Sequence, residues 1–118
     1  MQPAPFETSS AEVDGVSVIA VRGELDLSTA PRLEAPLDAA LNGGSTSVLI
    51  DLSECEFIDS TGIALIVRAW QQLEGNGSGQ LGICNPNEQV RRVLDVSGLD
   101  QSIPVHPSRE DALVALRA

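Results

Sequence analysis

Ser60 is the residue of this chain whose type and position point most directly to chemistry, because it stands in the run Asp59-Ser60-Thr61-Gly62. An apolar run at 48–52, typical of a buried strand, comes first, and a short acidic loop separates it from this motif. The motif itself is predicted to open an amphipathic helix. A hydroxyl at the start of a helix lies at the positive end of the helix dipole, where a phosphate is well received. Serine is also a common helix cap. The sequence therefore leaves two interpretations of Ser60, a capping residue or a switch.

Catalysis and metal binding have weak support in the sequence. The one histidine, His106, stands near the end of the chain, and nothing in its spacing places it beside Ser60 for acid–base work. No Gly-x-Ser-x-Gly motif is present. Asp26 and Asp59 are a conceivable metal site, but two carboxylates are a weak signal. We therefore expect a protein that is not an enzyme, with no catalytic residue, no metal and no cofactor. Turnover in an activity assay would be needed to support the alternative of a small enzyme.

The composition limits the partners that this chain can have. Its 118 residues carry a formal net charge of −10, its seven cationic residues are all arginine, and 3% of its residues are aromatic. An acidic surface with few aromatic rings is unsuited to nucleic acid and to anionic membranes, so we expect neither. The negative charge fits a protein partner with a basic or mixed face. It is equally explained if the charge serves only to keep the protein soluble. The absence of lysine excludes a phospho-aspartate receiver domain, a family with a lysine late in its chain.

The two cysteines, Cys55 and Cys84, lie far apart and lack the spacing of a metal or redox motif. Both stand at the edges of apolar segments, so we expect buried, reduced thiols in a cytoplasmic protein. Residues 1–5 lack the basic start and apolar run of a signal peptide. The longest apolar run, 63–67, is too short to span a bilayer.

The apolar pattern predicts strands that alternate with helices over most of the chain. Asp14-Gly15 is a hairpin signal that joins the first two strands, and Pro36 predicts a kink in the first helix. Alternating strands and helices imply a mostly parallel sheet. We expect one α/β domain over 1–118, of order β-β-α-β-α-β-α-β-α with one antiparallel edge strand. The predicted strands are 6–10, 16–21, 47–52, 81–84 and 103–105, and the predicted helices are about 30–41, 60–74, 86–97 and 109–116.

Two acidic loops are predicted to follow neighbouring strands. The first is Gly23-Glu24-Leu25-Asp26, and the second contains Asp59 and Ser60. In open α/β sheets, function gathers beyond the carboxyl ends of the strands. If the two strands are neighbours, Asp26, Asp59 and Ser60 share one surface patch.

Several motifs together resemble the anti-sigma factor antagonists, the bacterial STAS-domain family. The likeness covers nearly the whole chain, and the combined set of motifs is specific although each one alone is weak. Its pieces are Gly23-Glu24-Leu25-Asp26 with Thr29-Ala30-Pro31, Leu52-Ser53-x-Cys55-x-Phe57-Ile58 with Asp59-Ser60-Thr61-Gly62, Val93-Leu94-x-x-x-Gly98-Leu99, and Ile103-Pro104-Val105-His106-x-Ser108.

The resemblance implies that Ser60 is phosphorylated by an anti-sigma factor that is itself an ATP-dependent serine kinase. The unmodified chain would bind that kinase and free a sigma factor, phosphorylation would switch binding off, and a phosphatase would reset it. By the same resemblance, Asp59 and Asp26 border the site and help recognition, and Glu24 is a secondary contact.

The resemblance also assigns Thr61 and Gly62 to the partner-binding motif, with Gly62 allowing close approach to the helix start. The chain departs from the family pattern immediately after Gly62, where Ile63-Ala64 replaces a more usual Leu-Gly. The alternative is a STAS interaction or scaffold module without a phosphorylation cycle, in a signalling or transport assembly.

Overall fold

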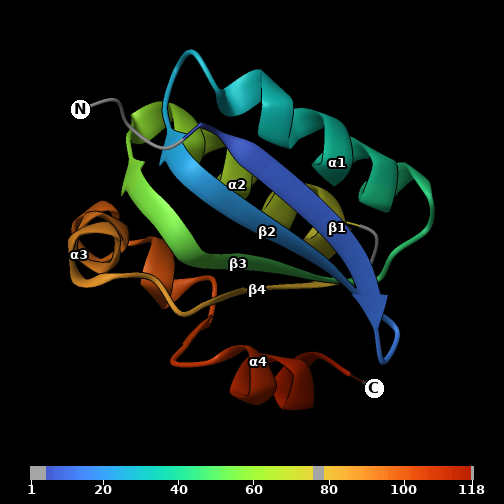
Figure 1. Cartoon of the computed structure of the whole chain (residues 1–118). Helices are drawn as coiled ribbons and strands as arrows, with labels where there is room; N and C mark the ends of the chain where they lie inside the picture. The colour runs from blue at the N-terminus through green and yellow to red at the C-terminus, as the bar shows by residue number, and fades with distance from the viewer. Residues whose placement is uncertain (1–4, 76–78, 118) are drawn as a thin grey trace.

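A computed structural model describes residues 5–75 and 79–117 as a five-stranded sheet with helices on both faces (Figure 1). The strand order is β1-β2-β3-β4-β5; β1 pairs antiparallel with β2, and the other neighbours pair in parallel. The predicted element order is thereby confirmed. The elements are β1 (Glu7–Val13), β2 (Val16–Leu25), α1 (Ala30–Asn42), β3 (Ser47–Ile58), α2 (Ser60–Gly75), β4 (Gln80–Cys84), α3 (Glu88–Ser97), a 3₁₀ turn (Leu99–Gln101), β5 (Val105–His106) and α4 (Arg109–Leu116).

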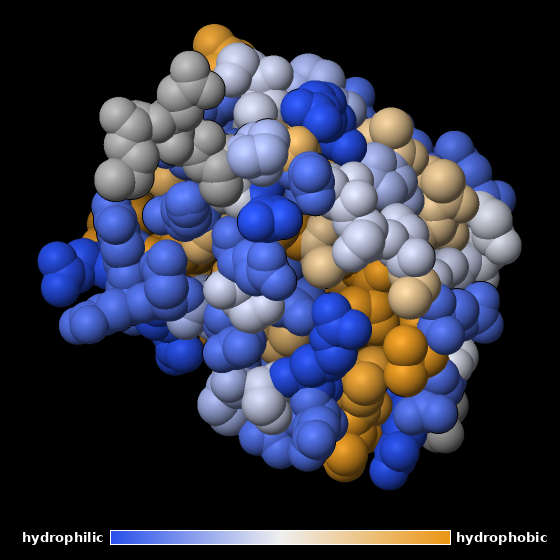
Figure 2. All heavy atoms as spheres, in the orientation of Figure 1, coloured by the Kyte–Doolittle hydropathy of each residue, from blue (hydrophilic) through white to orange (hydrophobic). Residues whose placement is uncertain are grey.

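The sheet separates two apolar clusters. Helices α1 and α2 lie side by side on one face, and α4 lies on the other (Figure 1). Along β3, Ile50 belongs to the cluster under α1, α2 and α3, whereas Leu49 belongs to the cluster under α4. A central strand covered on both faces explains why 47–52 reads as a continuous apolar run. Polar colour predominates on the face seen in Figure 2, with apolar colour gathered where the β1–β2 end lies beside α4.

Strands β2 and β3 are longer than predicted, because residues 23–25 pair with residues 55–58, while Asp26 and Asp59 lie just beyond the paired residues. Gly23 lies opposite Cys55, and Leu25 lies opposite Ile58. The register shifts at Gly23, whose φ is 96°, so this position is a bulge that favours glycine. The correction places the end of β2 at Leu25 and the end of β3 at Ile58.

Helix α1 runs through Pro36, which does not end it. The missing N–H of Pro36 removes one helical hydrogen bond, while the fully buried Leu33 and Leu37 hold this stretch against the sheet. Thr29 stands at the N-cap position of α1, yet its side chain makes no capping hydrogen bond. Tertiary packing therefore outweighs the local defect at Pro36.

The turns and caps of the second half are largely as predicted. Gly98 ends α3 in the left-handed conformation, with φ of 78°, and the Ser108 hydroxyl accepts a 3.1 Å hydrogen bond from the Asp111 amide. The start of α3 was predicted wrongly. The helix begins after Asn87, because the side chain of this asparagine accepts a 2.7 Å hydrogen bond from the Val90 amide and so satisfies one free amide of the first turn.

Both cysteines are buried free thiols, as predicted. Burial raises the pKa of Cys55 to about 11 and that of Cys84 to about 12, so both stay protonated at neutral pH. None of the helices within the described ranges has the length and apolar content needed to cross a membrane.

Gly62 brings α2 against the ends of β2 and β3. A Cβ at this position would lie 2.8 Å from Leu25 Cγ and 2.9 Å from Ile58 Cγ1. Such distances are too short for carbon atoms, so a side chain here would push α2 away from the sheet. The start of α2 is therefore fixed by packing that only glycine permits.

Gly62→Ala is expected to destabilise the fold by about 1–2 kcal/mol, since the overpacking cost outweighs the better helix propensity of alanine. Gly75→Ala is the matched control, because Gly75 lies in the same helix and a Cβ there meets nothing within 4 Å. Urea unfolding of both variants measures the difference in free energy. Equal stabilities for the two variants would show that the contact with Leu25 and Ile58 relaxes freely.

Candidate functional site

The side chain that caps α2 is Asp59, and Ser60 is left exposed. Asp59 Oδ1 accepts hydrogen bonds from the amides of Thr61, at 2.9 Å, and Gly62, at 3.2 Å. No hydrogen bond among the residues that the structure describes engages the Ser60 hydroxyl, and Ser60 is solvent-exposed. The capping interpretation of Ser60 is therefore wrong, because the preceding carboxylate already performs that task.

The acidic loop after β2 is a tight turn built around Asp26. Its Oδ1 accepts hydrogen bonds from the Ser28 amide, at 2.9 Å, and the Ser28 hydroxyl, at 2.7 Å. The Thr29 hydroxyl accepts from the Asp26 amide at 2.9 Å and donates to the Glu24 carbonyl at 2.7 Å. The hydrogen bond from the Ser28 hydroxyl lowers the pKa of Asp26, which therefore stays ionised at neutral pH.

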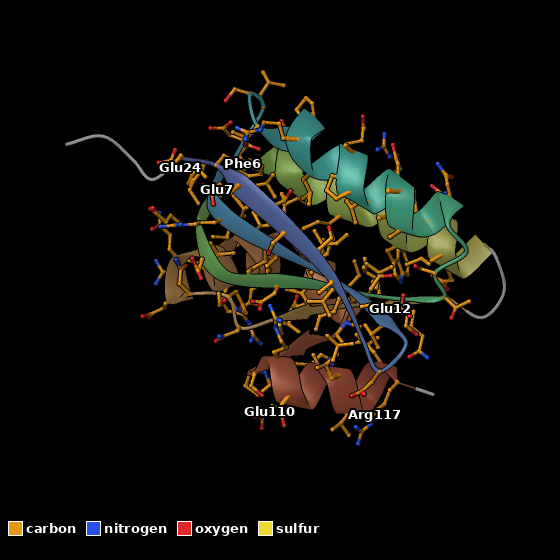
Figure 3. The ribbon with its side chains drawn as sticks, turned by 45° about the vertical axis from the view of Figure 1, so that its right-hand side comes forward. Phe6, Glu7, Glu12, Glu24, Glu110 and Arg117 are labelled. Atoms are coloured by element: carbon orange, nitrogen blue, oxygen red, sulfur yellow. The ribbon has the colours of Figure 1, made fainter. Side chains whose placement is uncertain are left out.

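The two acidic segments meet at one end of the sheet, as predicted. The Asp59 amide donates a 3.1 Å hydrogen bond to the Leu25 carbonyl, which joins the end of β3 to the end of β2. Asp26 and Asp59 are each partly exposed, one residue beyond the paired ends of these strands. Glu24 is exposed at the same end of the sheet as Phe6, far from Glu12 at the opposite end (Figure 3).

Thr61 and Gly62 differ from Ser60 in what they present. Thr61 is half-buried and lines a groove between α1 and α2, together with Leu27 and Pro31. Gly62 is buried, and its missing side chain accommodates Leu25. The structure therefore gives Gly62 a role in internal packing, and its expected role in a partner's approach stays a prediction.

Ser60 lies on the rim of a second groove, between the start of α2 and the end of α3. Apolar side chains line it, Ile63 from α2 with Val93 and Val96 from α3, and Arg92 adds the one charged side chain. Val96 is 83% exposed, an unusual state for a valine. The two hydroxyl residues Ser60 and Thr61 thus face different grooves on either side of α2.

Sequence reasoning missed three exposed apolar residues, of which Val96 shares a groove with Ser60. Leu27 is 75% exposed on the turn before α1, Phe57 is 36% exposed at the end of β3, and Val96 completes the set on α3. Apolar side chains clustered on a surface mark sites of protein interaction. The signal available was Val96 itself, since it falls outside the inward spacing of Val90, Val93 and Leu94 on its helix.

Other candidate chemical groups are not brought to Ser60. His106 lies in β5 opposite Cys84, separated from β3 by β4. Within residues 5–75 and 79–117, no cluster of three His, Cys, Asp or Glu side chains is arranged to hold a metal ion. The arrangement around Ser60 therefore offers an accessible hydroxyl beside a mostly apolar groove.

Comparisons with known proteins agree with this geometry. The chain is 29% identical over 115 residues to the anti-sigma-F factor antagonist RsfB of Mycobacterium tuberculosis, covering 98% of this chain and 93% of the relative. Its structure superposes on that of an anti-sigma factor antagonist from Mycobacterium paratuberculosis with a TM-score of 0.89 and 35% identity, over 97% and 96% of the two chains.

A second solved structure is that of the phosphorylated form of the Bacillus cell fate determinant SpoIIAA. It matches with a TM-score of 0.71 and 25% identity, over 96% of this chain and 100% of that one. The family model described as the STAS domain matches residues 8–112. The chain therefore belongs to the STAS domain family.

Proposed function

We propose that this chain is an anti-sigma factor antagonist whose Ser60 hydroxyl accepts a phosphoryl group from a serine-kinase anti-sigma factor. The observation that supports the proposal most strongly is that Asp59, and not Ser60, caps the start of α2. Asp59 satisfies the Thr61 and Gly62 amides, so the Ser60 hydroxyl is exposed and free to react without loss of the helix cap. The similarity to RsfB and SpoIIAA supports the same assignment.

The surface around Ser60 suits a protein partner. Exposed apolar side chains at Leu27, Phe57 and Val96 supply contact area, and carboxylates at Asp26 and Glu24 supply negative charge. Apolar anchors surrounded by polar groups are typical of protein interfaces. A partner with apolar pockets and a basic rim complements this surface, and the net charge of −10 would speed its approach.

The proposed reaction is a phosphoryl transfer from ATP. Ser60 Oγ forms a bond to the γ-phosphorus while the bond from that phosphorus to the β–γ bridging oxygen breaks, and ADP leaves. The hydroxyl proton passes to a base of the kinase, and Mg²⁺ of the kinase offsets the charge that develops on the leaving group. This chain contributes a hydroxyl that is positioned by the capped helix and accessible to the kinase.

The phosphate then acts as a switch on binding. It adds about −1.5 to −2 charges beside Asp26 and Asp59, and the start of α2 stabilises such charge by only about 0.3–1 kcal/mol. At the interface, the added bulk and the cost of burying a phosphate dianion against the partner's apolar pockets amount to several kcal/mol. The fold is preserved while the complex dissociates, and hydrolysis of the phosphate ester by a phosphatase restores the binding form.

Ser60→Ala is expected to abolish phosphate incorporation and to leave kinase binding within about twofold, because a methyl group neither reacts nor fills the groove. The experiment incubates the protein with ATP and the serine kinases of its own genome, and maps phosphate by mass spectrometry. Ser53→Ala is the matched control, since Ser53 is an exposed serine of β3. Phosphate on the Ser60→Ala variant would place the acceptor elsewhere.

Val96→Asp is expected to weaken binding of the unmodified chain to the kinase by about tenfold, because it places a charge where an apolar contact forms. Val114→Asp is the control, since Val114 is also exposed, at 62%, but lies on α4 across the sheet. Calorimetric titration measures both affinities. Equal losses for the two variants would argue against a binding surface at Ser60.

A further inference from the structure

The arginines of this acidic chain are nearly all engaged. Among residues 5–75 and 79–117, five of them form ion pairs with carboxylates, and the Arg32 guanidinium lies 5.3 Å from the centre of the Phe6 ring. Arg92 has neither kind of contact within those residues. The pairs are Arg22 with Glu7 and Glu54, Arg68 with Glu34, Arg91 with Asp95, Arg109 with Asp51, and Arg117 with Asp14.

The unpaired arginine lies beside the proposed phosphoacceptor. Arg92 and Ser60 line the same groove between α2 and α3, whose remaining walls are mostly apolar. An arginine guanidinium donates paired hydrogen bonds to phosphoryl oxygens, and surroundings low in competing polar groups strengthen such a contact. We propose that Arg92 pairs with the phosphate once Ser60 carries it and holds that phosphate over the groove. This inference rests on the proposed function, since it assigns a residue to the modified state of the same site.

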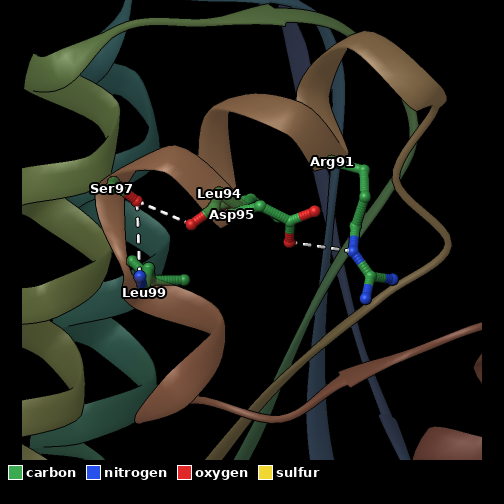
Figure 4. A network of polar contacts seen from close by, with 5 residues as sticks. All are labelled: Arg91, Leu94, Asp95, Ser97 and Leu99. Atoms are coloured by element: carbon green, nitrogen blue, oxygen red, sulfur yellow. Dashed lines mark hydrogen bonds and ion pairs between the residues drawn. The ribbon is translucent and has the colours of Figure 1, made fainter.

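The neighbouring arginines are poorly suited to this role. Arg68 lines the other groove of α2, on the side of Leu27, and is paired with Glu34. The Arg91 Nε atom donates a 3.2 Å hydrogen bond to Asp95 Oδ1 along one side of α3 (Figure 4). Of Arg68, Arg91 and Arg92, it is therefore Arg92 that can gain an anionic partner without giving one up.

The pairing changes how the switch works. A phosphate drawn toward Arg92 lies across Ile63, Val93 and Val96, the apolar lining of the groove. It then covers the surface that a partner's apolar side chain would enter. The phosphorylated chain is closed to its partner by an internal contact, and Arg92 is the positioning residue of that contact.

The test uses protein in which phosphoserine is incorporated at position 60 during translation, so no kinase is needed. The second ionisation of the phosphate, with a pKa near 6, is followed by ³¹P nuclear magnetic resonance. Arg92→Ala is expected to raise that pKa by about 0.5, a threefold change in the protonation constant, because the dianion loses its partner. The difference is expected to shrink in 1 M salt.

Arg91→Ala is the matched control, since it removes the same charge from the adjacent position of α3. Thermal unfolding of the unphosphorylated variants checks that both fold normally. An unchanged phosphate pKa in Arg92→Ala, or an equal rise in Arg91→Ala, would overturn the pairing. Failure of every kinase to modify Ser60 would defeat the proposed function while the titration still reports on Arg92, so the two failures are distinguishable.

Discussion

The cap formed by Asp59 is the interaction on which the site depends. A helix start leaves several amide groups without partners, and one carboxylate oxygen here satisfies those of Thr61 and Gly62. Ser60, which follows Asp59, is therefore not needed to cap the helix. A residue needed for the fold is a poor switch, because modifying it would cost stability as well as binding. The order of two adjacent side chains, acid first and hydroxyl second, separates the two tasks.

Contacts with β2 hold that cap in place, and an ion pair farther along β3 anchors the strand itself. The Asp59 amide is bonded to the Leu25 carbonyl, so the end of β3 cannot move independently of β2. Gly62 lets α2 contact Leu25 and Ile58 closely. On the opposite face, Arg109 at the start of α4 forms a 2.7 Å ion pair with the buried Asp51 of β3. Rigid elements on both sides of the central strand position an exposed hydroxyl with little freedom, as recognition requires.

Local patterns predicted the elements well where one physical effect dominates. The Asp14-Gly15 turn, with positive φ at both residues, follows from the hairpin signal, and the end of α3 follows from Gly98. The extents of β2 and β3 were not predictable, because Glu54 and Glu56 point outward while buried Cys55 and Ile58 continue the strand. Serine and aspartate are equally good caps, so the sequence also left open which one caps α2. The position of Arg92 and Val96 beside Ser60 was not predictable, because it depends on the packing of α3 against α2, which no local sequence pattern determines.

The central claim is that one phosphate at Ser60 disrupts a complex and leaves the fold intact. Calorimetric titration of the serine-kinase anti-sigma factor with the chain carrying phosphoserine at position 60, and with the same sample after phosphatase treatment, tests it most directly. We expect affinity about a hundredfold lower for the phosphorylated form, equivalent to about 3 kcal/mol, with unchanged circular dichroism. Equal affinities of the two forms would contradict the account.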